Sequence, residues 1–406
     1  MTHVADSFRQ RLDRIARTSH GRVLAALTHT CRDLHAAEDA LAAAWVAALR
    51  TWPDQGEPDR PEAWLLTVAR RRLLDQHRRT ATRRTSDFDV ADLPDLSETP
   101  QDIPDQRLRL LFTCAHPALD PAVRAPMLLQ CVLGLSSEQI AGRFLTSPAA
   151  MKRRLTRAKT KLREAGVAFE VPEADQLDGR IGTVLDAIYA AFGVAHDDAL
   201  GDAAATRVAC DDALDLARAA AELLPTVPEA LGLAALCGYC RARADALGED
   251  IYVPLDQQDP TAWDPALIKA SDDRLRDAAA FGKPGRYQFE AALQSAHIER
   301  LRHGGDHWPR ILVMYDTLLA FRPTLGAALG RAVALSKVEG PTAGLAALDT
   351  LPADLTATHQ PFHAVRAALL AEANDPTAPA AFDQAIALTT RPAVRRYLVS
   401  RKAKVS

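Results

Sequence analysis

The residues best suited to contact another molecule form a cationic run from Met151 to Glu164, MKRRLTRAKTKLRE, which holds seven Lys or Arg and one Glu. The whole chain of 406 residues has a formal net charge of only −3, so this run is a local feature. Lys and Arg bind phosphate groups, which suits the run to the backbone of a nucleic acid. Taken alone, it is equally compatible with a solvated face, a membrane-surface helix or a peptide-binding helix.

The apolar residues of the run have helical spacing. They recur at intervals of four, three and four residues and predict one apolar stripe, with the cations on the other faces. Ser147 is the predicted N-cap, and Pro148 is suited to the first helical position, where no N–H is needed. The residues of the stripe are Met151, Leu155, Ala158 and Leu162.

A short helix, SEQIAGRF, is predicted just before the basic helix. Ser136 and Gln139 form a capping-box pattern at its start, and the small Ala141 would allow the two helices to approach closely. A short helix, a tight turn and a longer basic helix are the layout of a helix-turn-helix, whose second helix enters the major groove of DNA. The turn position where glycine is common is Leu145 here.

Charge alternates strongly along the first part of the chain. Residues 70–84 contain seven Arg and one acid, whereas residues 87–105 contain seven Asp or Glu and no base. The acidic segment also contains three prolines, so we expect an extended linker without a core of its own. The pattern predicts two cationic surfaces joined by an anionic linker.

The composition favours an all-α fold. Alanine is abundant, aromatic residues make up 5% of the chain, and the alternation typical of strands is hard to find. There is no run of 18 uncharged apolar residues, and the N-terminus is polar, which predicts a soluble, cytoplasmic chain. The six scattered cysteines are expected to be reduced. The length predicts two or three domains.

Two helices are predicted before the acidic linker. In AAEDALAAAWVAALRTW one helical stripe contains Ala37, Leu41, Trp45 and Leu49, and Trp45 is expected in the core. The second helix starts near Pro61 and runs EAWLLTVARRRLLDQHRR, apolar at first and basic at its end.

Three segments together resemble a known family. The segments AEDA, RPEAWLLTVARRRLLDQHRR and LSSEQIAGRFLTSPAAMKRRLTRAKTKLRE are similar to regions 2 and 4 of bacterial extracytoplasmic-function sigma factors, in the sigma-70 family. The segment RLRLLFTCAHPALDP and the helical tail resemble the subgroup with a C-terminal tetratricopeptide-like extension. The resemblance implies region 2 at 8–84, an acidic linker at 85–107, region 4 at 108–166 and the extension at 180–404.

The resemblance also implies site residues. Glu38 and Asp39 match the region that faces core RNA polymerase, although acids early in a helix are also favoured by the helix dipole. The cations of the basic helix would contact the minus-thirty-five element, and the second helix would face the minus-ten element. The minus-thirty-five residues are Lys152, Arg153, Arg154 and Arg157, and the minus-ten residues are Trp64, Arg71, Arg72, Gln76, Arg78 and Arg79.

Two features of the first domain leave alternatives open. Trp64 could stack on an unpaired base or pack in the core. The chain also departs from the family, with Ala42–Ala44 where a Gln-Glu pair is usual and Arg71 where Asn is usual, which bears on polymerase contact and promoter choice. The linker is expected to be a solvated spacer. The alternative is that it extends into the polymerase cleft.

The segment after residue 180 reads as successive helices separated by Pro and Gly. Helical pairs are expected at 206–223 with 228–247 and at 308–320 with 324–337, followed by a set at 361–401. The segments around Gly232 and Gly330 resemble each other, and their spacing of 98 is close to three periods of about 33 residues. This pattern fits tetratricopeptide-like hairpins, in which small residues let paired helices approach.

Other residues that could support chemistry are better explained by packing. Cys237 and Cys240 form an isolated CxxC on an apolar helix, and Cys114 with His116 lies at a helix boundary. The segment HGGDHW, residues 303–308, has glycines that argue against a fixed metal-ligand spacing. Phosphate-loop, GxGxxG, HExxH and GxSxG motifs are lacking, so neither an enzyme nor a metal or cofactor site is expected.

These features predict an alternative sigma factor that binds core RNA polymerase and promoter DNA and has no membrane partner. Its extension is a hypothesised regulator that could contact the sigma domains of the same chain. One alternative is a helix-turn-helix regulator with a repeat sensor domain that never joins polymerase. Another is a repeat adaptor whose basic helices bind proteins.

Overall fold

The computed structural model describes residues 15, 19–81, 106–144, 146–198, 203–247 and 252–405. Within these residues the regular secondary structure is helical and no strand occurs, which confirms the predicted all-α fold. The chain divides into two compact units, residues 1–191 and 192–406, which are described separately below. Most of the predicted acidic linker, 85–107, lies outside the described residues.

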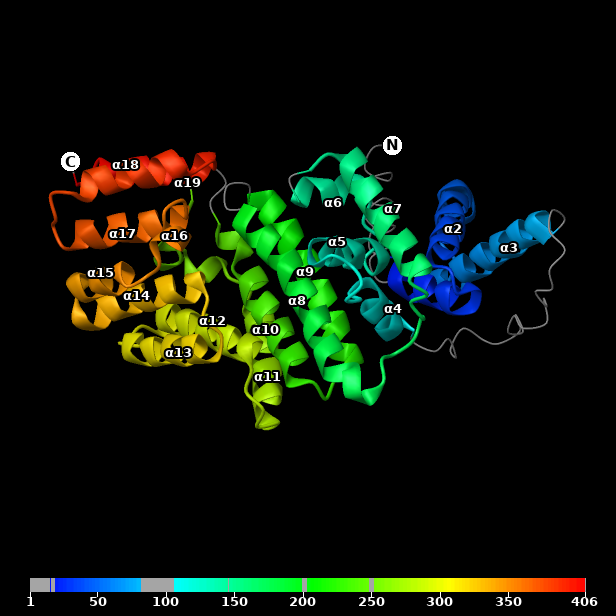
Figure 1. The fold of residues 1–406 in the computed structure, drawn as a ribbon, viewed down its shortest axis with the longest axis horizontal. Coiled ribbons are helices and arrows are strands. Elements are labelled where there is room, and N and C mark those ends of the chain that lie inside the picture. The colour runs from blue at the N-terminus through cyan, green and yellow to red at the C-terminus, as the bar shows by residue number, and fades with distance from the viewer. Residues whose placement is uncertain are drawn as a thin grey trace. The chain divides into compact units, whose positions relative to one another are not determined.

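The first unit contains the two predicted cationic helices. A helix over residues 19–31 precedes them, and the last helix of the unit continues across the boundary at residue 191. The named helices are α2 (Leu34–Gln55), α3 (Pro61–Ala81), α4 (Arg107–Cys114), α5 (Pro121–Cys131), α6 (Ser137–Arg143), α7 (Pro148–Glu164) and α8 (Ala174–Asp198) (Figure 1).

Helices α2 and α3 form a hairpin, but α2 buries a different face from the predicted one. Trp45 is only half-buried and Leu49 is 55% exposed, so the expectation that Trp45 belongs to the core was wrong. Small side chains let the neighbouring helices approach closely, which centres the buried face on the alanines and leaves Trp45 and Leu49 at its margin. The buried residues are Ala37, Ala40, Leu41, Ala44, Ala48 and Trp52.

The second unit is a succession of packed helices. Helix α9 packs on α10, α13 on α14, and α17 on α18, and α15 lies between the last two pairs in Figure 1. The helices are α9 (Ala203–Leu223), α10 (Pro228–Ala242), α11 (Pro265–Ala280), α12 (Arg286–His303), α13 (Trp308–Phe321), α14 (Leu325–Glu339), α15 (Pro341–Asp349), α16 (Ala353–Thr356), α17 (Gln360–Glu372), α18 (Ala378–Leu388) and α19 (Pro392–Lys402).

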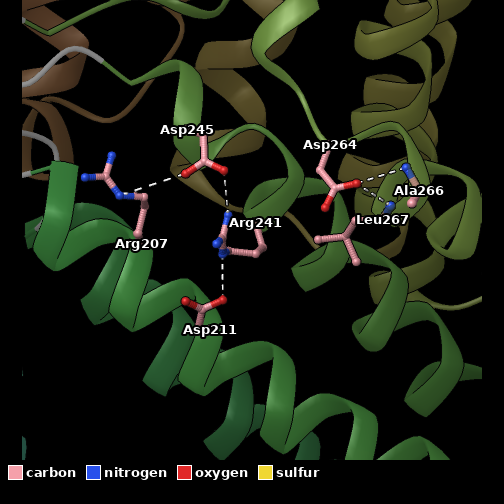
Figure 2. A network of polar contacts seen from close by, with 7 residues as sticks. All are labelled: Arg207, Asp211, Arg241, Asp245, Asp264, Ala266 and Leu267. Atoms are coloured by element: carbon pink, nitrogen blue, oxygen red, sulfur yellow. Dashed lines mark hydrogen bonds and ion pairs between the residues drawn. The ribbon is translucent and has the colours of Figure 1, made fainter. Parts of the chain in front are cut away.

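Ion pairs join the first helices of this unit. Arg241 of α10 lies 2.6 Å from Asp211 of α9 and 3.3 Å from Asp245, and Arg207 lies 3.9 Å from the same Asp245 (Figure 2). Asp211 and Asp245 are about half exposed, and such pairs add little stability because water screens them. Nearby, Asp264 accepts hydrogen bonds from two backbone amides and caps α11. The pairs therefore orient α9 and α10, and apolar burial holds them together.

The two related glycine segments make different contacts. A Cβ on Gly330 of α14 would lie 2.4 Å from the ring of Tyr315 on α13, so this predicted close approach of paired helices is confirmed. A Cβ on Gly232 of α10 would lie 2.8 Å from Gln288, which belongs to α12 and not to the predicted partner helix. Both positions need a small residue, but the sequence similarity does not reflect equivalent packing.

The residues weighed as possible metal ligands are placed by local packing. Cys237 and Cys240 are buried in α10, and burial raises the pKa of both thiols. His116 accepts a hydrogen bond from the Ala118 amide within a turn, and His307 contacts the Gly304 carbonyl. Among the described residues, no group of three or more His, Cys, Asp or Glu is placed to hold a metal ion. No helix among the residues that the structure describes has the length and apolar character that a membrane span requires.

His297 of α12 is a buried titratable group in the second unit. Its side chain is 9% exposed and its ring lies 5.8 Å from that of Trp308 and 6.5 Å from that of Tyr315. Burial, together with the nearby cations Arg300 and Arg243, lowers the pKa of His297 to about 4. The folded unit therefore favours the neutral imidazole.

This depressed pKa predicts a loss of stability in mild acid. Because the unfolded chain binds the proton more readily, the contribution of His297 is fully present above about pH 6.5 and decreases towards pH 4. Between pH 7 and pH 5 the wild type should lose about 2 kcal/mol more than His297→Phe. Urea unfolding followed by tryptophan fluorescence at the two pH values measures the difference. Equal losses in both proteins would contradict the assignment.

Candidate nucleic-acid interface

Helix α7 is capped and packed as its sequence predicts. The Ser147 hydroxyl accepts a hydrogen bond from the Ala150 amide at 3.2 Å, and Pro148 occupies the first turn. The predicted apolar stripe is confirmed, because all four of its residues are at most 5% exposed. Burial of this stripe fixes the rotation of α7 about its axis and so decides which cations face solvent.

The short helix α6 precedes α7 in the predicted arrangement. Ser136 accepts from the Gln139 amide at 3.3 Å, while the Gln139 side chain accepts from the Ser136 amide at 2.8 Å, which confirms the capping box. Ile140 and Ala141 of α6 are buried, as is Met151 of α7, and the two helices pack together. Leu145, in the turn, lies outside the described residues.

The four cations assigned to the minus-thirty-five element are all exposed on α7. Lys161 and Arg163, near the end of the helix, are exposed as well. The seventh cation, Lys159, differs from them because its side chain is only 12% exposed. The exposed set assigned to DNA is Lys152, Arg153, Arg154 and Arg157.

The residues assigned to the minus-ten element lie on α3. Arg71 and Arg72 are exposed there. The side chains of Gln76, Arg78 and Arg79 lie outside the described residues, although the α3 backbone continues to Ala81.

Trp64 takes part in packing between α2 and α3, which is one of the two roles that the sequence left open. Its ring packs edge-on against Trp52 of α2, with ring centres 5.3 Å apart, and Trp52 is 3% exposed. The Trp45 ring also packs edge-on against Trp52, with ring centres 6.3 Å apart. Trp64 is half-buried, so it helps to join α2 to α3 and still presents part of its surface to solvent.

The two acids assigned to polymerase have different environments. Asp39 is exposed, whereas the Glu38 side chain is only 15% exposed and its carboxylate lies 2.5 Å from the Lys159 ammonium. Lys159 also donates to Gln130 at 2.6 Å, and the Cys131 thiol donates to Glu38 at 3.6 Å. No local sequence pattern links these residues, because they come from α2, α5 and α7.

Close backbone packing surrounds this ion pair. A Cβ on Gly21 would lie 2.6 Å from the Val132 carbonyl oxygen, and one on Gly134 would lie 2.7 Å from the His20 ring. Gly134 also has a φ of +71°, which favours glycine. Burial and the Lys159 charge lower the pKa of His20 to about 4. The helix over residues 19–31 is therefore held directly against the segment between α5 and α6.

A cleft of about 1230 Å³ adjoins the ion pair within the first unit. Its lining includes Glu38 and Asp39 from α2 and Lys152 and Lys159 from α7. The acidic start of α2 and one side of the cationic helix therefore border the same space.

Comparisons with known proteins match three parts of the chain. Residues 15–84 match the family model of sigma-70 region 2, and residues 109–162 match that of sigma-70 region 4. Residues 180–279 match a family described as being of unknown function, DUF6596. A protein of Rhizobium meliloti (strain 1021) that is named as uncharacterized is 35% identical over 391 residues, which cover 93% of this chain and 92% of that protein. No solved structure matches.

The capping box predicts a specific stability effect. Ser136→Ala leaves the Gln139 amide without its side-chain acceptor and should lower the free energy of unfolding by about 1 kcal/mol. Ser137→Ala, one residue into the helix, is the matched control and should change it by less than about 0.5 kcal/mol. Urea denaturation followed by circular dichroism compares the two. Equal effects would show that the cap does not stabilise α6.

Proposed function

This chain belongs to the sigma-70 family and is an alternative sigma factor of the extracytoplasmic-function type that directs promoter-specific transcription; from this premise we propose how its helices divide the contacts with promoter and polymerase. Sigma factor families are not enzymes, and their domains imply core RNA polymerase and promoter DNA as partners. We place the protein in the cytoplasm, where those partners are.

Helix α7 is the proposed reader of the minus-thirty-five element. The observation that carries this proposal is the exposure of Lys152, Arg153, Arg154 and Arg157 on a helix whose opposite stripe is buried. Most of these charges would bind phosphates, each adding roughly 0.9 to the slope of log affinity against log salt. A bidentate base contact by one of the arginines would discriminate between bases by about 1–3 kcal/mol.

Helix α3 is the proposed minus-ten surface. Exposed Arg71 and Arg72 supply cationic groups, and the solvent-facing part of Trp64 supplies a ring on which an unpaired base could stack. Gln76, Arg78 and Arg79 complete the proposed set on the same helix. The domain bounds of this proposal are 8–84 for region 2, 85–107 for the linker, 108–166 for region 4 and 180–404 for the extension.

The proposed polymerase surface is the acidic start of α2, with Glu38 and Asp39. The match to region 2 favours this assignment over a helix-turn-helix regulator that never joins polymerase, because such a regulator has no need of region 2. Exposed Val46 and Leu49, 48% and 55% accessible, extend the surface along α2. Apolar side chains beside acids are suited to a protein partner.

We further propose that the second unit regulates the sigma domains. It consists of packed helices in addition to those that match regions 2 and 4, and helical repeats generally present extended binding surfaces. In this proposal the second unit binds the sigma domains of the same chain.

The exposed cations of α7 are divided into those proposed to bind DNA and those at the end of the helix that are not. This division predicts a difference between two double variants. Arg153→Ala with Arg154→Ala should weaken promoter binding by the holoenzyme and reduce the salt slope by about 2, with lost footprint protection at minus thirty-five. Lys161→Ala with Arg163→Ala removes the same charge from the end of the helix and should leave that protection in place. Loss of protection in both pairs would mean that total charge, and not the position of the cations, decides binding.

Truncation tests the regulatory role of the second unit. Because α8 spans residue 191, the shortened chain should end after Asp198 so that this helix is kept whole. Run-off transcription with core polymerase should differ between the full and shortened chains in amount or in promoter choice. Equal activity on the same promoters would remove the regulatory proposal while leaving the sigma assignment intact.

A further inference from the structure

The Glu38–Lys159 ion pair joins the two halves of the promoter-binding machinery. Glu38 belongs to α2, within the match to region 2, and Lys159 belongs to α7, within the match to region 4. Their charged groups are 2.5 Å apart, and the side chains are 15% and 12% exposed. The pair therefore lies within a contact between the two regions and is not a solvated surface bridge.

Both charged groups have further partners that fix their positions. Lys159 donates to the Gln130 side chain of α5 at 2.6 Å, and Glu38 accepts from the Cys131 thiol through its second oxygen, Oε1. Both carboxylate oxygens of Glu38 are therefore engaged. These two contacts use about half of the lone pairs of the carboxylate, and with 15% of the side chain exposed, little of it is accessible to another protein.

The backbone packing supports a defined closed arrangement. Gly21 meets the Val132 carbonyl and Gly134 meets the His20 ring at distances that leave no room for a Cβ. Arg109 of α4 also lies 2.9 Å from His29 in the helix over residues 19–31. These contacts join the same two regions as the ion pair, so the pair is one part of an extended interface.

We propose that the Glu38–Lys159 pair, between α2 and α7, is a latch that holds regions 2 and 4 together and masks the polymerase surface. Core polymerase and Lys159 compete for the same carboxylate, so the closed form binds polymerase weakly. This inference rests on the proposed role of Glu38 in polymerase binding. Displacing Lys159 from Glu38 is energetically unfavourable, because a buried charge that loses its partner is strongly disfavoured.

The latch is tested in the full chain with Lys159→Met, which removes the charge and keeps most of the apolar stem. The Kd for core polymerase should fall roughly fivefold or more, the lower end of typical coupling between two sites. Spectroscopic labels at Arg50 and Arg163, both exposed, should move apart in this variant. Lys161→Met, an exposed cation on the same helix, is the matched control and should change neither the Kd nor the label distance.

A second variant covers the case in which Lys159→Met disturbs folding. Gln130→Ala removes one anchor of Lys159 and leaves both charges present, so it should shift the Kd and the label distance in the same direction by a smaller factor. If neither variant changes either quantity while both remain folded by circular dichroism, the latch is refuted.

The failure of the latch can be distinguished from failure of the proposed polymerase surface. In the Lys159→Met background, where the latch is absent, Glu38→Gln should weaken polymerase binding if Glu38 contacts polymerase directly. If Lys159→Met binds polymerase more tightly and adding Glu38→Gln does not change the Kd, the closed interface stands but competition for Glu38 is overturned. If Lys159→Met leaves the Kd for polymerase unchanged and Glu38→Gln weakens binding, the latch is overturned and the polymerase surface stands.

Discussion

The arrangement of the first unit depends on the burial of one narrow apolar stripe on α7. Its four residues are small or medium in size, and their burial fixes the rotation of the helix against α5 and α6. Every cation of the helix must then lie off the stripe, and most of them face solvent. The same constraint turns Lys159 towards α2, since it lies next to Ala158 at the margin of the buried face. One hydrophobic constraint thus divides seven similar charges into an exposed set and a sequestered one.

This division connects DNA recognition with polymerase binding. A cation on the exposed face of α7 is available to phosphates over a wide range of conditions, because the charge is already solvated. Lys159 and Glu38 pair with each other where little of either side chain reaches water, so a new partner for either one has to displace the other. In the proposed latch, this packing of the two promoter-binding regions would lower the affinity for polymerase without a separate inhibitory protein. The price is a buried pair of charges, which is costly to desolvate and adds specificity to the closed form more than stability.

The second unit is stabilised in another way. Its alanine-rich helices pack closely where Gly330 meets Tyr315 and Gly232 meets Gln288, and its ion pairs lie mainly at the surface. Such pairs set the orientation of neighbouring helices but contribute little free energy. Buried groups that would be costly to charge, such as His297 and the thiols of α10, are kept neutral. These features are those of a packed scaffold.

The sequence by itself determined the features that depend on neighbouring residues. The caps at Ser136 and Ser147, the stripe of α7 and the all-α composition follow from spacings of three and four residues, which a helix imposes locally. Only the tertiary structure decided which face of α2 is buried, because alanines and larger apolar residues are spread around that helix and the partner helices select among them. It likewise decided that Lys159 pairs with Glu38. That contact joins residues far apart in the chain, and seven cations on one helix look alike until a neighbouring helix covers one of them.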